Sequence, residues 1–95
     1  MQEAKSVLLY NRSVTVTVLL FASVAEKAGR RSVELPSADG DTVHSVCERL
    51  FAGYPDLRAF APRLLYAINE EYARADDPVP PGATLALIPP VSGGQ

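Results

Sequence analysis

Few residues in this 95-residue sequence are of the types that carry out nucleophilic or metal chemistry. His44 and Cys47 are the only histidine and cysteine, and both fall in the segment DGDTVHSVCERLFAGYP. A nucleophilic Cys–His pair needs contact in an accessible, electropositive setting, and a structural zinc site needs several ligands at defined spacing. Because Cys47 occupies an apolar stripe of this segment, we expect it to be buried and inert. His44 lies one step off the stripe, where it could pair with Glu48. We expect no metal site and no catalytic residue here.

Two adjacent carboxylates, Glu70 and Glu71, follow Asn69 in the segment INEEY. To act as an acid and a base they would need an enclosing pocket that shifts their pKa values. Nothing apolar in the neighbouring sequence encloses them, so we expect a solvated hairpin tip. The sequence also lacks a glycine-rich phosphate loop. The body of the protein is therefore predicted to be a scaffold rather than an enzyme.

The C-terminal segment LIPPVSGGQ offers a different kind of chemistry, because no charged side chain occurs from Pro78 to Gln95. Such a segment can enter an apolar channel without burying an unpaired charge. Pro89 and Pro90 favour an extended stalk with a small entropic cost of docking. Gly93 and Gly94 lack a Cβ atom, so a partner could close around the backbone and reach the terminal carbonyl. Residues 89–94 could extend roughly 20 Å from the sheet.

Ordering such a tail costs about 1–2 kcal/mol per residue, so the body must supply a second contact with the partner. Phe21, Tyr72 and Ile88 are the candidates, since each is an apolar side chain near a strand end or turn. The alternative is that all three belong to the core. The sequence pattern alone leaves both possibilities open.

The elements that must position these residues follow from hydrophobic periodicity. Strict alternation predicts a first strand at 14–22, whose outer face becomes apolar at Leu19 and Phe21. A short helical turn or loop stopped by Gly29 should follow. Further strands are expected at 31–36, 64–69, around Tyr72 and at 83–88. The segment after Pro55 should be irregular or a short turn, and a loop is expected at 76–82. The first and fifth strands are both strongly apolar and are predicted to be central neighbours.

The strongest helix signal begins at Asp41 or Thr42, either of which can cap the orphan N–H groups. Gly53 and Pro55 should end this helix. Its apolar side chains recur with helical spacing. They are Val43, Val46, Cys47, Leu50 and Phe51. The predicted order is β-β-α-β-β-β, an α+β fold with one main helix packed across a mixed five-stranded sheet.

Composition places the chain among ordinary globular domains, with 47% hydrophobic and 21% charged residues. We expect an N-terminal extension at 1–13, a domain at 14–88 and an extended tail at 89–95. A net charge of −2 with scattered arginines argues against nucleic acid as a partner. A single cysteine fits a reducing compartment, so we expect a cytoplasmic protein. No apolar run is long enough to span a bilayer, so we expect no membrane partner.

Three segments together resemble the small subunit of molybdopterin synthase and its relatives, the ubiquitin-like sulfur-carrier (MoaD/ThiS) family. They are VTVLLFASVAEKAG at 16–29, AINEEY at 67–72 and PPGATLALIPPVSGG at 80–94. The INEEY turn and the IPPVSGG ending are specific in combination. The resemblance implies a ubiquitin-like β-grasp fold, in agreement with the predicted order of elements.

The resemblance also implies a sulfur carrier that binds no permanent cofactor. In the family, an adenylating enzyme of the ubiquitin-activating type (MoeB-like) uses ATP to activate the carboxylate of the final glycine. A sulfur donor then replaces AMP, leaving a thiocarboxylate. Here that position matches Gly94, with Gly93 before it.

The loaded tail of the family enters the large synthase subunit (MoaE-like), where sulfur passes to cyclic pyranopterin monophosphate. The residues that match this tail are Pro89, Pro90, Val91 and Ser92. Phe21, Tyr72 and Ile88 match the apolar surface that the family presents to its partners.

Gln95 departs from the family pattern, because an amide bond to Gln95 removes the free carboxylate of Gly94. A protease that trims Gln95 is the explanation we favour; a divergent role or tolerance of the extra residue are the others. The remaining alternatives in function are a sulfur carrier for cysteine or thiazole biosynthesis, a protein modifier conjugated through Gly94, and an interaction domain without tail chemistry.

Overall fold

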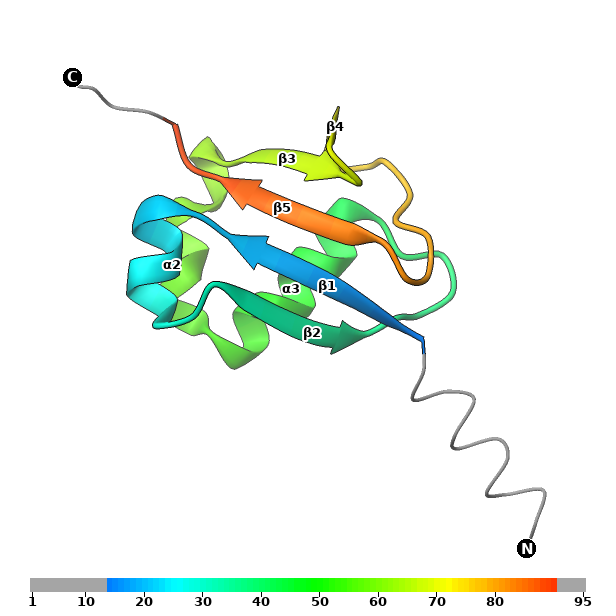
Figure 1. The fold of residues 1–95 in the computed structure, drawn as a ribbon, viewed down its shortest axis with the longest axis horizontal. Helices are drawn as coiled ribbons and strands as arrows, with labels where there is room; N and C mark the ends of the chain where they lie inside the picture. Colours follow the sequence, from blue (N-terminus) through cyan, green and yellow to red (C-terminus); the bar gives the residue numbers. More distant parts are fainter. Residues whose placement is uncertain (1–13, 91–95) are drawn as a thin grey trace, which may run out of the picture.

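The alternation of side chains along the first strand decides which face of the sheet is buried. In β1 (Thr15–Leu20), Val16, Val18 and Leu20 are buried, while the residues between them are only partly buried. In the computed structural model, which describes residues 14–90, β1 lies inside a five-stranded sheet of order β2-β1-β5-β3-β4 (Figure 1). The other strands are β2 (Ser32–Pro36), β3 (Leu65–Ile68), β4 (Glu71–Ala73) and β5 (Thr84–Ile88).

The centre of the sheet is the pair that the sequence predicts. β1 and β5 run parallel, with Val18 opposite Leu85 and Leu20 opposite Leu87. The other neighbouring strands are antiparallel. Parallel pairing needs a long crossover connection, and here the chain between β1 and β5 supplies all the remaining elements. The mixed α+β sheet is therefore confirmed.

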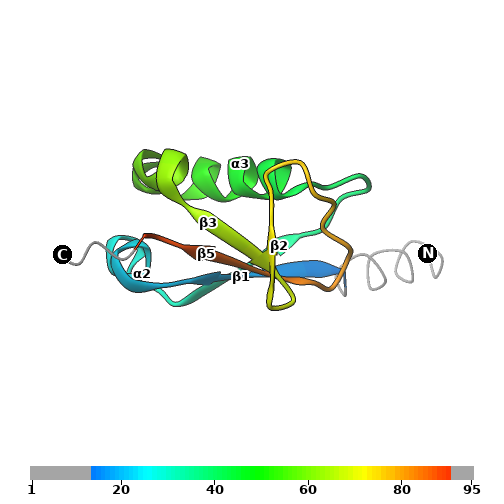
Figure 2. The ribbon, with the colours of Figure 1, turned by 90° about the horizontal axis from the view of Figure 1, so that it is seen from above.

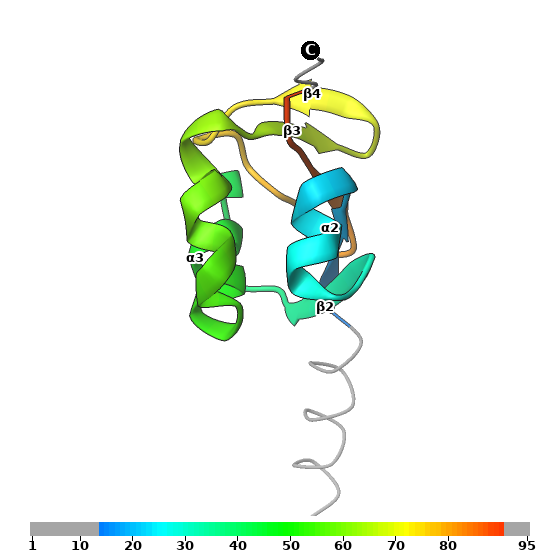
Figure 3. The same cartoon turned by 90° about the vertical axis from the view of Figure 1, so that its left-hand side faces the viewer.

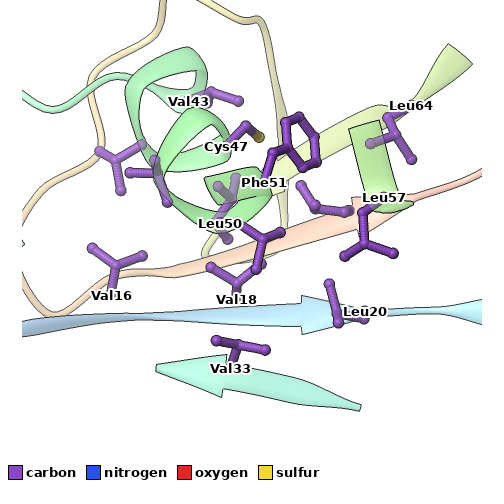
Figure 4. Close-up of a cluster of buried hydrophobic side chains, with 14 of the residues drawn as sticks. Val16, Val18, Leu20, Val33, Val43, Cys47, Leu50, Phe51, Leu57 and Leu64 are labelled. Carbon is purple, nitrogen blue, oxygen red and sulfur yellow. The ribbon is translucent and has the colours of Figure 1, made fainter. Parts of the chain in front are cut away.

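The helical layer covers one face of the sheet (Figure 2). Its main element is α3 (Val43–Gly53), and all five residues of the predicted apolar stripe are buried. Figure 4 shows one of them, Leu50, pointing from α3 toward Val18 of β1. The opposite, outer face of the sheet carries none of the helices. No helix in residues 14–90 is long and apolar enough to cross a membrane.

Two helical segments go beyond the predicted single helix. α2 (Ala22–Ala28) is a complete helix where a short turn or loop was expected, and it ends at Gly29 in the left-handed conformation. It lies at the end of the sheet where β1 ends, beside the helical layer (Figure 3). The 3₁₀ helix η1 (Pro55–Arg63) replaces the predicted irregular segment. Leu57 and Phe60 both join the core across η1 because their spacing matches the 3₁₀ repeat.

The start of α3 is capped more completely than the sequence indicates. Thr42, one of the two predicted caps, forms a reciprocal capping box with Ser45. The next N–H groups, of Val43 and His44, donate to the carbonyls of Asp77 and Ala75. The loop before β5 therefore satisfies donors that every helix start leaves free.

Asp41, the other predicted cap, has a different role. Its carboxylate is buried and lies 2.7 Å from the Arg49 guanidinium, which also donates to the carbonyl of Pro36. Burial alone would raise the pKa of Asp41, but hydrogen bonds from Arg49, the Ala38 N–H and the Ser45 hydroxyl together hold this pKa below its ordinary value. The Arg49 side chain therefore connects α3 to the loop at Asp41 through the ion pair and to the end of β2 through its hydrogen bond with Pro36.

We expect Asp41→Asn to lower the free energy of unfolding by about 1–3 kcal/mol at neutral pH, because it leaves Arg49 without its charge partner. A lowered pKa contributes stability above the unfolded value, and this contribution is lost as the pH falls through the folded value. The difference from the parent should therefore be constant down to about pH 5 and shrink below about pH 4. Urea unfolding across this range measures it. Asp39→Asn, in the exposed part of the same loop, is the control, and an unchanged difference at low pH would contradict the assignment.

Candidate functional site

Apolar side chains form a row across the outer face of the sheet. Leu19 lies opposite Ala86, Ala86 opposite Ala67, and Ala67 opposite Tyr72. Opposed residues in neighbouring strands point to the same side, so this row runs from β1 to β4. A second pair, Leu65 and Ile88, lies next to it. This half of the outer face is therefore apolar, although no element of the described chain covers it.

The row lines a shallow depression of about 790 Å³, which we call the outer-face groove. Its lining comes from the ends of β1 and β5, from β3 and from the β3–β4 hairpin. The lining residues are Leu19, Phe21, Ala67, Asn69, Glu70, Tyr72, Thr84, Ala86 and Ile88. Three large apolar side chains of this face stay exposed: Phe21 to 38%, Leu65 to 50% and Tyr72 to 78%. Uncovered apolar surface of this kind is typical of a protein contact site.

Phe21, Tyr72 and Ile88, which are far apart in the sequence, all line this groove. The alternative that all three belong to the core is wrong for Phe21 and Tyr72, and Ile88 is half-buried. Sequence reasoning missed Leu65, because β3 is apolar throughout and gave no sign of which side chains face outward. The role of these residues as partner contacts remains a prediction.

Phe21 stands between two depressions. Besides the outer-face groove it borders a smaller one of about 510 Å³, lined also by α2 residues and by Arg31. Its carbonyl accepts hydrogen bonds from the Val24 and Ala25 N–H groups at the start of α2. The backbone at Phe21 is therefore held by the helix while its side chain is left accessible.

The predicted tail begins inside the body of the protein. β5 ends at Ile88, Pro89 is buried, and Pro90 is exposed. The prediction of a projecting stalk at Pro89 therefore needs adjustment by one residue, since the first exposed residue after β5 is Pro90. Val91, Ser92, Gly93, Gly94 and Gln95 lie outside the described residues, and their predicted roles stay predictions.

The two candidate catalytic residues of α3 differ in burial, since Cys47 is buried and His44 is exposed. Cys47 is buried, and desolvation together with the Glu48 charge raises the pKa of its thiol to about 12. The thiol therefore stays protonated at neutral pH and is a poor nucleophile. The predicted pair of His44 with Glu48 is not the main contact of that carboxylate. Glu48 forms an ion pair with Arg58 instead, with 3.1 Å between the guanidinium nitrogen and the carboxylate oxygen. Within residues 14–90, no three His, Cys, Asp or Glu side chains gather closely enough to hold a metal ion.

The hairpin tip is the tight reversal that INEEY predicts. Ile68 pairs with Glu71, so the turn consists of Asn69 and Glu70 alone, and both have positive φ, 48° and 75°. These values match the two-residue turn that suits the twist of a hairpin, for which Asn-Gly is the favoured sequence. Asn tolerates the left-handed region, whereas Glu does so at a cost of roughly 1–2 kcal/mol. Both carboxylates at this tip are exposed, as predicted.

A mixed sheet with a parallel central pair, a helix across one face and an apolar opposite face defines a protein of the ubiquitin-like β-grasp class. The ThiS family model matches residues 18–94, most of the chain. The chain therefore belongs to the ThiS family.

Similar proteins agree with this assignment. The chain is 35% identical to the molybdopterin synthase sulfur carrier subunit of Arabidopsis thaliana, over 86% of this chain and 85% of that one. Its identity to the subunit of the same name from Escherichia coli strain K12 is also 35%, over 83% of this chain and 99% of that one. The crystal structure of SAMP1 from Haloferax volcanii superposes with a TM-score of 0.74 at 36% identity, covering 84% of this chain and 99% of that one. A second structure of this small archaeal modifier protein 1 gives a TM-score of 0.70 at 31% identity, with 81% and 98% coverage.

We expect Glu70→Gly to raise the free energy of unfolding by about 1 kcal/mol, because glycine adopts positive φ without the steric cost that Glu bears. Glu71→Gly is the matched control. It lies in β4 with ordinary backbone geometry, so glycine there should lower stability instead. Thermal or urea unfolding compares the two variants, and a loss of stability in both would contradict the strain at Glu70.

Proposed function

We propose that this chain is the sulfur-carrier subunit of a molybdopterin synthase. The observation that carries the proposal is the continuity between the groove and the diglycine segment. β5 lines the outer-face groove through Thr84, Ala86 and Ile88, and two residues after Ile88 the chain reaches Pro90 and the sequence VSGG. A partner docked on the groove would therefore receive the end of the chain at the same time. Relatives over most of this chain have the sulfur-carrier name.

The chemistry of the proposal takes place at Gly94. An adenylating enzyme of the ubiquitin-activating type joins the Gly94 carboxylate to AMP, releasing pyrophosphate from ATP. A sulfide equivalent (HS⁻) from the donor then attacks the carbonyl carbon and displaces AMP, and loss of a proton leaves the thiocarboxylate. A carboxylate is a poor electrophile, and adenylation supplies the leaving group that it lacks. Because the pathway requires a free carboxylate on Gly94, we also propose that a protease first removes Gln95.

The body of the protein contributes delivery and positioning. The large synthase subunit would dock on the outer-face groove, with Phe21, Tyr72 and Ile88 as apolar contacts and the segment from Pro90 to Gly94 inserted into its active site. Cyclic pyranopterin monophosphate would be the sulfur acceptor there. We place these steps in the cytoplasm, where the single thiol of the chain would stay reduced.

A second candidate function is conjugation to proteins through Gly94. The similarity to a small archaeal modifier protein at 31–36% identity favours it. A modifier would form an amide bond between Gly94 and a lysine of a target, and it would use the same activation by adenylation. The two functions therefore differ in what becomes of the activated glycine.

We expect the chain ending at Gly94 to gain the mass of one oxygen-to-sulfur exchange when it is incubated with ATP, the adenylating enzyme and a sulfur donor. The full chain ending at Gln95 should gain nothing in the same mixture. Intact-mass spectrometry measures both, and a denaturing gel of cell extract reveals conjugates if the modifier function operates. Loading of the full chain without loss of Gln95 would contradict the trimming step.

We expect Phe21→Ala to weaken binding of the large synthase subunit by about tenfold or more, since exposed aromatic anchors dominate interfaces of this kind. Phe21→Leu should retain part of the affinity. Arg58→Ala, on the helical layer away from the groove, is the control and should bind like the parent. Calorimetric titration measures the three dissociation constants, and equal affinity of Phe21→Ala and the parent would exclude the groove as the docking surface.

A further inference from the structure

Asn69 does more than form the tight turn, because it also extends the sheet by one pair of hydrogen bonds. The last regular pair between β3 and β5 joins Ile68 to Leu85. Thr84 lies one residue beyond this pair, opposite the turn. Its carbonyl accepts a hydrogen bond from the Asn69 N–H at 2.9 Å, and its N–H donates to Asn69 Oδ1 at 3.0 Å. The side-chain carbonyl thus stands where a regular strand would offer its backbone carbonyl.

This pair of bonds fastens the β3–β4 hairpin to β5 at the hairpin tip. β4 has three residues, lies at the edge of the sheet and pairs with β3 alone. Tyr72 lies in the middle of β4, opposite Ala67, with 78% of its surface exposed. Packing therefore contributes little to holding Tyr72 in place. Its position over the outer-face groove depends on how firmly the hairpin is held.

Asn69, Thr84 and Tyr72 all line the groove, and β5 leads from Thr84 to Ile88 and Pro89. The Asn69–Thr84 pair thus joins the far wall of the groove to the strand from which the C-terminal segment continues. A rigid connection of this kind reduces the entropy lost when a partner engages both parts at once.

We propose that Asn69 is a positioning residue for partner docking, acting through Tyr72. This inference rests on the proposed function, in which the large synthase subunit binds the outer-face groove. Asn69 itself need not contact the partner. Its side chain fixes the hairpin so that Tyr72 is already placed before the partner arrives.

The test is a double-mutant cycle on the full chain, with the purified large synthase subunit of the same organism as the binding probe. Asn69→Ala removes the acceptor for the Thr84 N–H and should weaken binding about fivefold, the equivalent of one hydrogen bond of about 1 kcal/mol. Asn69→Asp keeps an acceptor oxygen and tolerates the left-handed backbone, so it should restore most of the affinity. In the Tyr72→Ala background, Asn69→Ala should have no further effect on the dissociation constant.

Two measurements separate positioning from general loss of stability. Amide hydrogen exchange at Thr84 should speed up in Asn69→Ala and not in Asn69→Asp. Thr42→Ala removes the cap of α3 on the helical side of the molecule and so lowers the stability of the domain. It should leave partner affinity unchanged.

The outcomes distinguish the inference from the function on which it rests. Parent-like affinity of Tyr72→Ala would contradict the docking role of Tyr72, and the positioning role of Asn69 would fall with it. If Tyr72→Ala weakens binding but Asn69→Ala has no effect, or the same effect in both backgrounds, only the Asn69 inference is overturned.

Discussion

The parallel pairing of β1 with β5 is the constraint on which the rest of the structure depends. Parallel neighbours end at the same edge of a sheet, so the last residues of β1 and of β5 must lie together. Here that edge brings Phe21 next to Ile88 on the outer face and places Pro89 and Pro90 directly beyond it. An antiparallel pair would have sent the C-terminal segment from the opposite end of the groove. The central strand pair therefore fixes the geometric relation between the apolar surface and the end of the chain.

The two faces of the sheet differ in how their apolar side chains are covered. The inner face is filled by α3, η1 and the alternate residues of β1 and β5. Arg49 of α3, which pairs with the buried Asp41, also donates a hydrogen bond to the Pro36 carbonyl and so ties β2 to this layer. The outer face keeps large apolar side chains in contact with solvent, a cost that folding alone does not explain. The thiol of Cys47 is enclosed on the inner side. The proposed function accordingly assigns the reaction to the end of the chain and does not use this thiol.

Much of this arrangement could be predicted from the sequence, because periodicity reports burial directly. Alternation predicts β1, the apolar segments predict the other strands, and the apolar stripe predicts α3. The apolar character of the first and fifth strands predicts that they are central neighbours. Features that depend on distant contacts were missed. Arg49 contacts Asp41 because α3 brings the two residues together in space. The prolines at 55 and 62 argue against a helix in the segment that forms η1. Which side chains of β3 face outward depends on the register of β3 with β5. Phe21, Tyr72 and Ile88 could be named as candidates, but only the sheet shows that they share one groove. The burial of Pro89 likewise follows from packing that no local pattern reports.

Pro89 is the last buried residue of the described chain, and Pro90 after it is exposed. Pro89 is buried against the body, and the rings of Pro89 and Pro90 restrict the backbone angle φ at both residues. The direction of the chain at Pro90 is therefore set largely by the direction of β5. Because a peptide chain advances by at most about 3.3 Å per residue, each residue added or removed after Pro90 changes by that amount the greatest distance that the end of the chain can reach from the sheet. The number of residues after Pro90 therefore limits how deep a partner site could lie.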